Sequence, residues 1–248
     1  MCRGVLLAVV VTLWGYPAQA NYVEHVHSSG RYDRSPASLH REAMRWDRAG
    51  VQLVTWTEVD AAARTRALRV AGWGVAVPPA SDVGISWRRR SFQVIAAGRR
   101  RLADYITPYA AAVVLQAERR RLIVVVAHLP AHVQDGHHFR ANSRAVEWRA
   151  AVRQLHTYAR DLRRRYSPAV LLIAADWNVD LRLPVWRDRL AAIFPRMALT
   201  WVPPFPLGGT HAGGRLIDAT LTGATGRARL LPDDASSDHR PYTERLTW

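Results

Sequence analysis

The chain has 248 residues, of which 49% are hydrophobic and 22% are charged, so it can bury a core and is not a disordered polypeptide. All 35 lysine-or-arginine positions hold arginine, and against 20 acidic residues they give a formal net charge of +15. This excess favours a polyanionic partner, but the complete absence of lysine is equally typical of a biased genome composition. The single cysteine, Cys2, excludes an internal disulfide and a cysteine-based zinc site.

Residues 1–20 have the pattern of a signal peptide. Arg3 precedes an apolar run over residues 5–14, and Ala18-Gln19-Ala20 has the small-x-small form of a cleavage site. We therefore expect a secreted or cell-envelope protein with one domain over residues 21–248. The alternatives are an uncleaved membrane anchor, for which the run is short, and a misplaced start codon, which would make the protein cytoplasmic.

The rest of the chain alternates short apolar runs with turn residues and two arginine-rich helical stretches. Periodicity predicts, in chain order, a strand at Tyr22–His27, a helix at Ser38–Ala49, a buried strand at Val51–Val59, one hairpin from Val83–Trp87 and Phe92–Ala96, and a second from Ala111–Ala117 and Leu122–His128. A helix follows at about residues 142–165, and then strands at Ala169–Ala175, Ile217–Leu221 and Tyr242–Trp248. Because some strands meet tight turns and others meet long crossovers, we predict a layered α/β sandwich with mixed sheets.

Several of these strands end in polar residues. Glu58, His128, the Asp176-Trp177-Asn178 triplet and Asp238-His239 all lie at or next to a strand end. Each has an ordinary explanation alone, such as a cap, a core histidine or a turn. Together they are the side-chain types that metal-assisted phosphate chemistry uses.

Five segments in this order resemble motifs of the endonuclease/exonuclease/phosphatase superfamily, which includes the DNase I-like nucleases. VTWTEV resembles the strand that ends in Gln-Glu-Val, VVAHLP the Thr-His-Leu strand, IAADWNVD the Gly-Asp-Phe-Asn turn, RLIDATLT the Ile-Asp-Tyr strand, and SSDHRPY the Ser-Asp-His-x-Pro closure. The resemblance spans about residues 22–248. It implies a four-layer αββα sandwich with two mixed β-sheets, a DNase I-like α/β (α+β) fold.

The resemblance also implies a division of labour in the site, with Mg²⁺ or Mn²⁺ as cofactor. Glu58 would be the principal metal ligand, and Asp238 would lie near the metal. Asp176 would orient or deprotonate the attacking water, and Asn178 would hold a phosphate oxygen. The remaining roles concern three residues: His128 would contact the scissile phosphate, and His239 would act as an acid or base oriented by Asp218. Which histidine is the acid and which is the base stays open.

The sequence departs from the family pattern at several places: Thr57 replaces the Gln before Glu58, Ala175 replaces the Gly before Asp176, and two further departures concern the site directly. Where the first strand of the family carries a metal-site Asn, the best match is His25, with His27 and Asn21 as rivals, and an imidazole there would alter the metal preference. A partner for the first histidine is not obvious; Tyr105 and Tyr109 are the candidates.

Three functions remain open. The first is a Mg²⁺-dependent nuclease acting on DNA or RNA, with DNA preferred; its additional support is the arginine content, with Arg88 and Arg89 as candidate phosphate contacts. The second is a secreted phospholipid or phosphoinositide phosphoesterase, which the signal-like start favours. The third is a non-catalytic nucleic-acid-binding protein of the same fold. No protein partner is evident, and a membrane contact is expected only through an uncleaved N-terminal segment.

Overall fold

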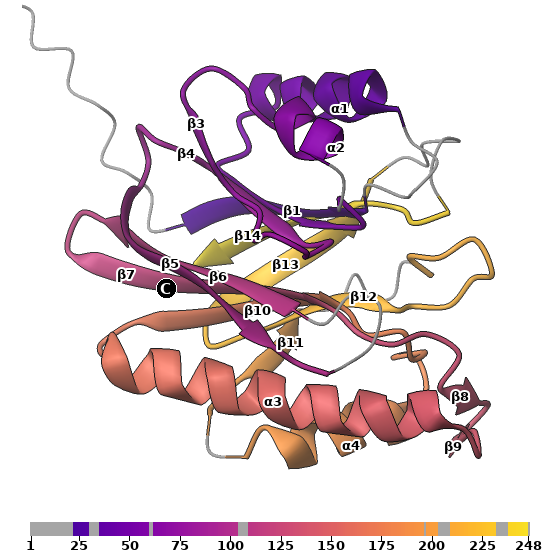
Figure 1. Cartoon of the computed structure of the whole chain (residues 1–248). Helices are drawn as coiled ribbons and strands as arrows, with labels where there is room; N and C mark the ends of the chain where they lie inside the picture. Colours follow the sequence, from indigo (N-terminus) through magenta and orange to yellow (C-terminus); the bar gives the residue numbers. More distant parts are fainter. Residues whose placement is uncertain are drawn as a thin grey trace, which may run out of the picture.

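The computed structural model describes residues 22–29, 35–59, 62–103, 109–195, 197–202, 209–231 and 238–247. Within these residues, two six-stranded sheets pack face to face and helices cover the outer face of each sheet (Figure 1). The predicted four-layer sandwich is therefore confirmed. The signal-like segment, Asn21 and Tyr105 lie outside the described residues.

The first sheet contains both ends of the described chain. Its strand order is β13 (Thr225–Leu230), β14 (Tyr242–Thr247), β1 (Tyr22–Ser29), β2 (Leu53–Thr57), β4 (Gly84–Arg88) and β3 (Trp73–Ala76). Only the β1–β2 pair is parallel. The helices α1 (Pro36–Arg48) and α2 (Ala62–Ala67) lie over this sheet, at the top of Figure 1. The Ser35 hydroxyl caps α1 by accepting the Ser38 N–H.

The second sheet runs through the middle of the sequence. Its order is β11 (Thr200–Val202), β12 (Asp218–Thr222), β10 (Val170–Asp176), β7 (Arg120–His128), β6 (Tyr109–Ala117) and β5 (Gln93–Arg101). The long helix α3 (Ser143–Arg165) and the shorter α4 (Pro184–Ile193) cover its outer face, and a small ribbon, β8 (Gln134–Asp135) with β9 (His138–Phe139), precedes α3. No helix in the described part of the chain is long and apolar enough to cross a membrane.

Side-chain alternation explains how the strands reach the site. In β7, Ile123 and Val125 pack in the core beneath α3, whereas Leu122, Val124 and Val126 pack in the core between the sheets. Because successive side chains point to opposite faces, the next residue on the inter-sheet side of β7 is His128. His128 therefore lies on the same face of β7 as the apolar side chains that pack between the sheets.

The β4–β5 hairpin predicted from the sequence is wrong. Both edges of β4 are occupied, by β2 and β3, while β5 pairs with β6 in the other sheet. Two neighbouring apolar runs look like a hairpin in the sequence, but here the turn between them carries the chain from one sheet to the other. The β6–β7 hairpin is confirmed.

Candidate active site

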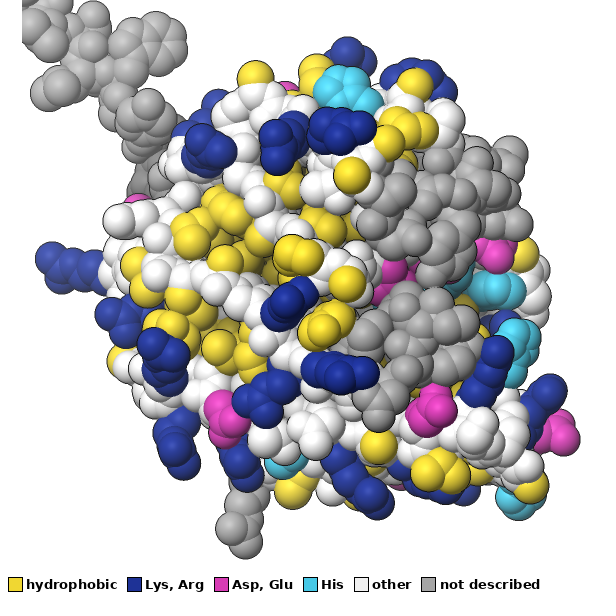
Figure 2. Space-filling model, in the orientation of Figure 1, with side chains coloured by type: hydrophobic (Ala, Val, Ile, Leu, Met, Phe, Trp, Pro, Cys, Tyr) yellow, Lys and Arg dark blue, Asp and Glu magenta, His cyan; other side chains and the backbone are white. Residues whose placement is uncertain are grey.

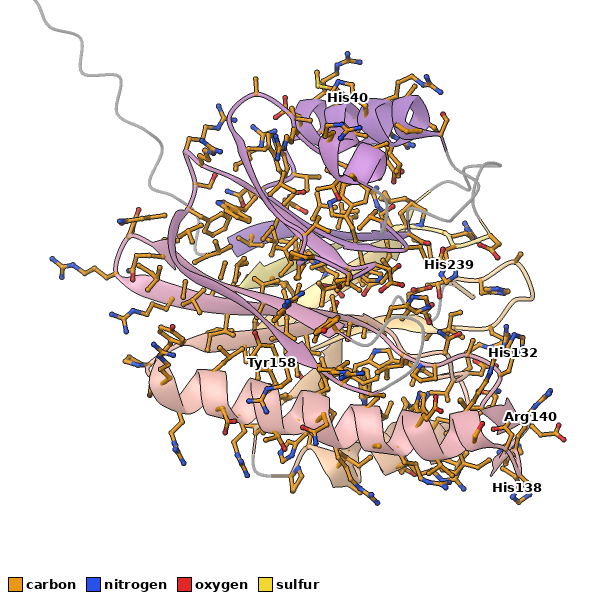
Figure 3. The ribbon with its side chains drawn as sticks, viewed as in Figure 1. His40, His132, His138, Arg140, Tyr158 and His239 are labelled. Carbon is orange, nitrogen blue, oxygen red and sulfur yellow. The ribbon has the colours of Figure 1, made fainter. Side chains whose placement is uncertain are left out.

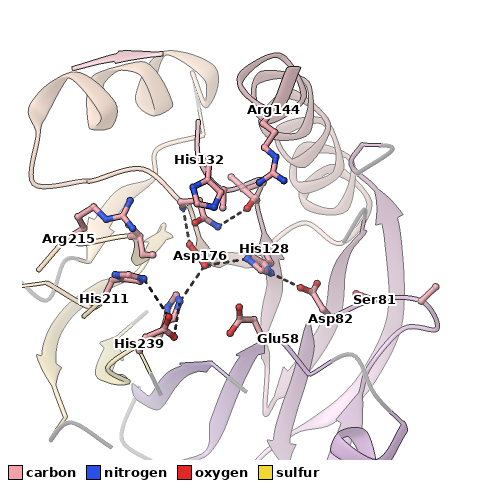
Figure 4. Close-up of a pocket in the computed structure, with 16 residues that line it drawn as sticks. Glu58, Ser81, Asp82, His128, His132, Arg144, Asp176, His211, Arg215 and His239 are labelled. Atoms are coloured by element: carbon pink, nitrogen blue, oxygen red, sulfur yellow. Dashed lines mark hydrogen bonds and ion pairs between the residues drawn. The ribbon is translucent and has the colours of Figure 1, made fainter. Parts of the chain in front are cut away.

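A pocket of about 870 Å³ opens where strands of both sheets end. Its base is formed by Glu58 after β2, His128 at the end of β7, Asp176 at the end of β10, and His239 before β14 (Figure 4). Residues 80–82, before β4, form one wall of the pocket. The structure therefore brings together side chains that are up to 181 residues apart in the sequence, in agreement with the site expected at the strand ends.

Strand register sets the centre of the site. Asp176 is paired with His128 on the parallel neighbour β7 and with Asp218 on the antiparallel neighbour β12. Residues paired across adjacent strands direct their side chains to the same face, so these three polar groups form one row facing the opposite sheet. Asp176 and Asp218 are buried, with 1% and 2% of their surface exposed.

Two aspartate–histidine pairs flank Asp176. The Nδ1 atom of His128 lies 2.5 Å from Asp82 Oδ2, and the Nδ1 atom of His239 lies 2.8 Å from Asp218 Oδ2. Both rings thereby present Nε2 to the same oxygen, Asp176 Oδ2, at 3.5 Å for His128 and 3.9 Å for His239. A carboxylate at Nδ1 fixes the orientation of the ring and leaves Nε2 for chemistry.

Asp82 was not anticipated from the sequence. It lies in the turn before β4, and its carbonyl oxygen accepts the Val59 N–H at 2.9 Å, which holds it beside the end of β2. It occupies the role for which Tyr105 and Tyr109 were considered. Tyr109 instead packs under the guanidinium of Arg99, 4.7 Å from its ring centroid. In the sequence, an Asp before an apolar strand looks like a turn residue. Its partner, His128, is 46 residues away and is identified only by the folded structure.

Burial and neighbouring charges shift the pKa values of Asp176, His128, His239 and Asp218 away from their ordinary values. Burial, followed by the nearby Asp218 carboxylate, raises the pKa of Asp176 to about 7. Burial alone would lower the pKa of His128 and His239, but Asp82 and Asp218, respectively, override it and raise both pKa values to about 10. Burial would raise the pKa of Asp218, yet the charge and hydrogen bond of His239 bring it well below its usual range.

Glu58 and Asn178 reach the pocket from unusual backbone conformations. Their φ angles are 58° and 54°, in the left-handed region that non-glycine residues seldom adopt. Such a conformation costs of order 1–3 kcal/mol and is found preferentially at functional sites. The Ser29 hydroxyl donates to Glu58 Oε2 at 2.6 Å, and the Asn178 side chain donates to the Leu129 carbonyl at 2.7 Å.

The donor set fits a hard divalent cation. Glu58, Asp82, Asp176 and Asp238 all line the pocket, and the Asp218 and Glu58 charges both contribute to the raised pKa of Asp176. A cation among these oxygens would relieve that repulsion, and carboxylate ligands suit Mg²⁺ or Mn²⁺. Glu58 and Asp238, the predicted ligands, both line this pocket, and Asp238 forms a group with His211 and His239 whose ligand atoms lie within 4.8 Å of one another.

The loop before β12 adds two residues that sequence reasoning missed. His211 and Arg215 line the pocket, and the Thr210 hydroxyl anchors their loop by accepting the N–H groups of Ile217 and Asp218. The Gly213 N–H donates to His211 Nδ1 at 3.1 Å, so the neutral ring carries its proton on Nε2, 3.7 Å from Asp238 Oδ2. Burial, then the nearby His239 and Arg215, lower the pKa of His211. His211 is therefore a neutral donor facing the pocket.

The opposite wall is also basic. His132, in the loop after β7, and Arg144, in the first turn of α3, line the pocket across from Arg215 (Figure 4). Figure 3 shows His132 below His239, on the path from the pocket toward β8 and β9. The reaction centre thus lies between two walls that carry positive or hydrogen-donating groups.

Three predicted residues do not reach the pocket. His25 was expected as a metal ligand, but it is fully buried, with Nδ1 2.8 Å from Glu244 and Nε2 2.9 Å from Thr55. Arg88 was expected to bind substrate, but its guanidinium donates to the Val51 carbonyl and pairs with Asp47 at 3.0 Å, beneath α1. Arg89 is exposed in the turn that follows β4, at the opposite end of that strand from Asp82.

The basic surface does not form one continuous track on the face seen in Figure 2. Arginine side chains, in dark blue, are spread over both the upper and lower layers, and apolar side chains lie between them. Histidine and acidic side chains gather toward the right-hand edge of that view, where the strands end.

Comparison with known proteins shows similarity in structure. No family model matches the sequence, and no curated protein matches it. Similar solved structures include D. rerio TDP2 complexed with single-strand DNA product (10% identity, TM-score 0.68, 92% of this chain and 99% of that one). A second is an endonuclease/exonuclease/phosphatase from Bacteroides vulgatus (13%, 0.69, 91% and 98%), and a third is a mannosyl-6-phosphatase from Bacteroides thetaiotaomicron (12%, 0.69, 91% and 100%). The chain therefore has the fold of the endonuclease/exonuclease/phosphatase superfamily.

Proposed function

We propose that the protein is a metal-dependent phosphodiesterase that hydrolyses nucleic acid, with DNA as the preferred substrate. The observation that carries this proposal is the position of Asp176, a buried carboxylate between two aspartate-backed imidazoles. Hydrolysis of a phosphodiester needs a base for the attacking water, charge stabilisation on the phosphoryl oxygens and a proton for the leaving oxygen. The described site offers a side chain for each task.

Asp176 is the base in this mechanism. With a pKa near 7, it is ionised in a substantial fraction of molecules at neutral pH and is basic enough to accept a proton from water. Its Oδ1 atom accepts the Asn178 N–H at 2.9 Å, which leaves Oδ2 directed between the two histidines. As the water oxygen attacks phosphorus, its proton passes to Asp176 and the bond to the leaving oxygen breaks.

His128 and His239 supply the general acid and a hydrogen-bond donor to the phosphoryl group. Both are imidazolium ions at neutral pH, because their raised pKa values keep Nε2 protonated. One ring donates its proton to the leaving oxygen, and the other hydrogen-bonds to a non-bridging oxygen. A divalent cation held by Glu58 and Asp238 would supply further charge neutralisation of the phosphoryl group.

The pocket walls support an extended anionic substrate. Arg215 and His211 on one side, and Arg144 and His132 on the other, would bind phosphate groups flanking the scissile bond. The TDP2 structure with single-strand DNA product supports a nucleic-acid substrate for this fold. The signal-like residues 1–20 support secretion, which recovery of the protein from the culture medium without these residues would test.

The experiment is a hydrolysis panel with the purified protein. Supercoiled plasmid, single-stranded DNA, RNA, sphingomyelin and inositol phosphates are incubated with Mg²⁺, Mn²⁺ or EDTA. We expect plasmid nicking that requires the cation and is lost in Glu58→Gln and His239→Ala, but kept in Asp188→Asn, an exposed control on α4. Nicking that survives EDTA or both active-site substitutions would refute the mechanism. Hydrolysis confined to the lipid or inositol substrates would refute the nucleic-acid assignment.

A further inference from the structure

A line of buried polar side chains crosses the space between the sheets behind the active site. In β1, β2 and β14 the inter-sheet side begins with the apolar Val23, Leu53 and Leu246 and continues with polar groups instead of further hydrocarbon. These polar groups, which we call the inter-sheet network, are Glu244, His25, Thr55 and His27.

Successive members of the network are in contact. Glu244 Oε2 lies 2.8 Å from His25 Nδ1, and His25 Nε2 lies 2.9 Å from Thr55 Oγ1. The same hydroxyl lies 2.8 Å from His27 Nδ1. All four side chains are buried, with at most 2% of their surface exposed. The network is therefore shielded from solvent throughout.

The network ends on the active site. His27 Nε2 faces Asp218 Oδ1 at 3.4 Å, an ion-pair contact, and neither atom has a hydrogen-bond partner in the described part of the chain. The other oxygen of Asp218 accepts from His239 Nδ1. Asp218 therefore lies between two rings: Oδ1 faces His27, and Oδ2 orients His239. The Tyr242 ring packs on His27, with ring centroids 5.5 Å apart, and limits its rotation.

The acceptor at this end fixes the direction of every hydrogen bond. An ionised carboxylate has no hydrogen to give, so the contact between His27 Nε2 and Asp218 Oδ1 is favourable only with the hydrogen on Nε2. The neutral ring of His27 then accepts at Nδ1 from the Thr55 hydroxyl, whose oxygen in turn accepts from His25 Nε2–H. His25 consequently accepts at Nδ1, and Glu244 must supply the hydrogen.

We propose that the inter-sheet network is positioning machinery for catalysis: with all its donors directed toward the site, it holds Asp218 in the place from which Asp218 orients His239. This inference rests on the proposed function. The ionisation of the network is consistent with its direction, because burial raises the pKa of Glu244 to about 8 and lowers the pKa of His25 to about 3.

Stability alone gives no reason for such a network. Burying polar groups is costly even when they are paired, and a layer of aliphatic side chains like Val23 and Leu53 would fill the same space without that cost. The network ends on the Asp218–His239 pair, and all its hydrogen bonds point toward that pair. Fixing the position of the pair is a function that would offset the cost, because small displacements of catalytic groups reduce rates strongly.

Thr55→Val is the test, because valine has nearly the shape of threonine but removes the hydroxyl that joins the two histidines. Thr55→Ser keeps the hydroxyl. Thr222→Val is the matched control: Thr222 is also a fully buried threonine on an inter-sheet position, but its hydroxyl donates to the Leu171 carbonyl at 2.7 Å, outside the network. Each variant is assayed for kcat, KM and melting temperature, and its histidine ring nitrogens are observed by ¹⁵N NMR.

We expect Thr55→Val to lower kcat roughly tenfold with KM little changed, in the range found for groups that orient catalytic side chains. Thr55→Ser should restore most of kcat, and Thr222→Val should lose comparable thermal stability without losing kcat. The NMR spectra should show the Nε2–H tautomer of His27 in the wild type and in Thr55→Ser, but not as the sole form in Thr55→Val.

Equal kcat values for Thr55→Val and Thr222→Val would overturn the proposal, as would an Nδ1–H tautomer of His27 in the wild-type protein. Absence of hydrolysis by the wild-type protein contradicts the proposed function instead. In that case the His27 tautomer still decides whether the network has the direction inferred here.

Discussion

Replacing Asp82 with asparagine isolates the charge that keeps His128 protonated. The asparagine oxygen can still accept from His128 Nδ1, so the ring stays in place while the carboxylate charge is lost. In the wild type, burial opposes protonation of His128, yet the pKa rises from 6.5 to about 10 because of Asp82 and, next, Asp176. That rise corresponds to about 5 kcal/mol in favour of the imidazolium, at about 1.4 kcal/mol for each pH unit.

The consequence is a shift in the alkaline limb of the pH profile. Wild-type kcat/KM should fall only as the pH approaches 10, where the imidazolium ions lose their protons. In Asp82→Asn, burial is no longer opposed by its main counter-charge, so this limb should move down toward the ordinary histidine pKa of 6.5. With the limb at that value, only about 1% of His128 is protonated at pH 8.5, so the rate there should fall roughly 100-fold.

The assay is kcat/KM for a chromogenic phosphodiester, bis(4-nitrophenyl) phosphate, between pH 5.5 and 10.5 with saturating Mg²⁺. Asp47→Asn is the control, because Asp47 pairs with a buried arginine outside the pocket. An alkaline limb of Asp82→Asn that coincides with that of the wild type would refute the role assigned to this pair.

Three further predictions concern binding and stability. Arg215→Ala should raise KM for single-stranded DNA roughly tenfold, as expected for loss of one charge-assisted hydrogen bond, whereas Arg164→Ala on the exposed end of α3 should not. Arg88→Met should lower the free energy of unfolding in urea by about 2 kcal/mol, because buried carbonyl groups lose their donor, and should leave kcat unchanged. Glu244 has a folded-state pKa of about 8, above its ordinary 4.5, so its contribution to stability is full below pH 4.5 and is lost as the pH rises through 8. Glu244→Gln should abolish the decline in the free energy of unfolding between pH 5 and pH 8, measured by urea unfolding. The same pH dependence in the variant and the wild type would contradict this prediction.

The parts of the site that lie on strand ends could be predicted from the sequence. His128 and Asp176 follow apolar runs, and neighbouring strands of one sheet bring their ends together. Asp218, the first residue of β12, was expected only from the family resemblance. The sandwich followed from the same periodicity. Periodicity does not show which strands pair with each other. For this reason β4 and β5 were predicted to form a hairpin, although they belong to different sheets.

Residues in loops and at strand interiors were harder to assign. Asp82 belongs to a turn whose position depends on the end of β2. His25 and His27 are two residues apart and so lie on the same face of β1; which of them approaches the site depends on β1 continuing to Ser29, two residues beyond the expected end. Arg88 appeared to be the first of three loop arginines, but β4 extends through it and buries it.

In this site the strands hold the groups proposed to carry out the reaction, whereas loops form much of the surface that a substrate would contact. The row from His128 to Asp218 belongs to the hydrogen-bonded sheet, so its atoms are held by the same interactions that hold the protein together. Two parts of the wall, residues 80–82 and the loop from Gly209 to Leu216, belong to connections that a sheet tolerates in many lengths and compositions. Substrate preference can therefore diverge by loop exchange while the reaction is retained, and a library confined to residues 209–216 is the natural starting point for redirecting this scaffold to a different phosphoester.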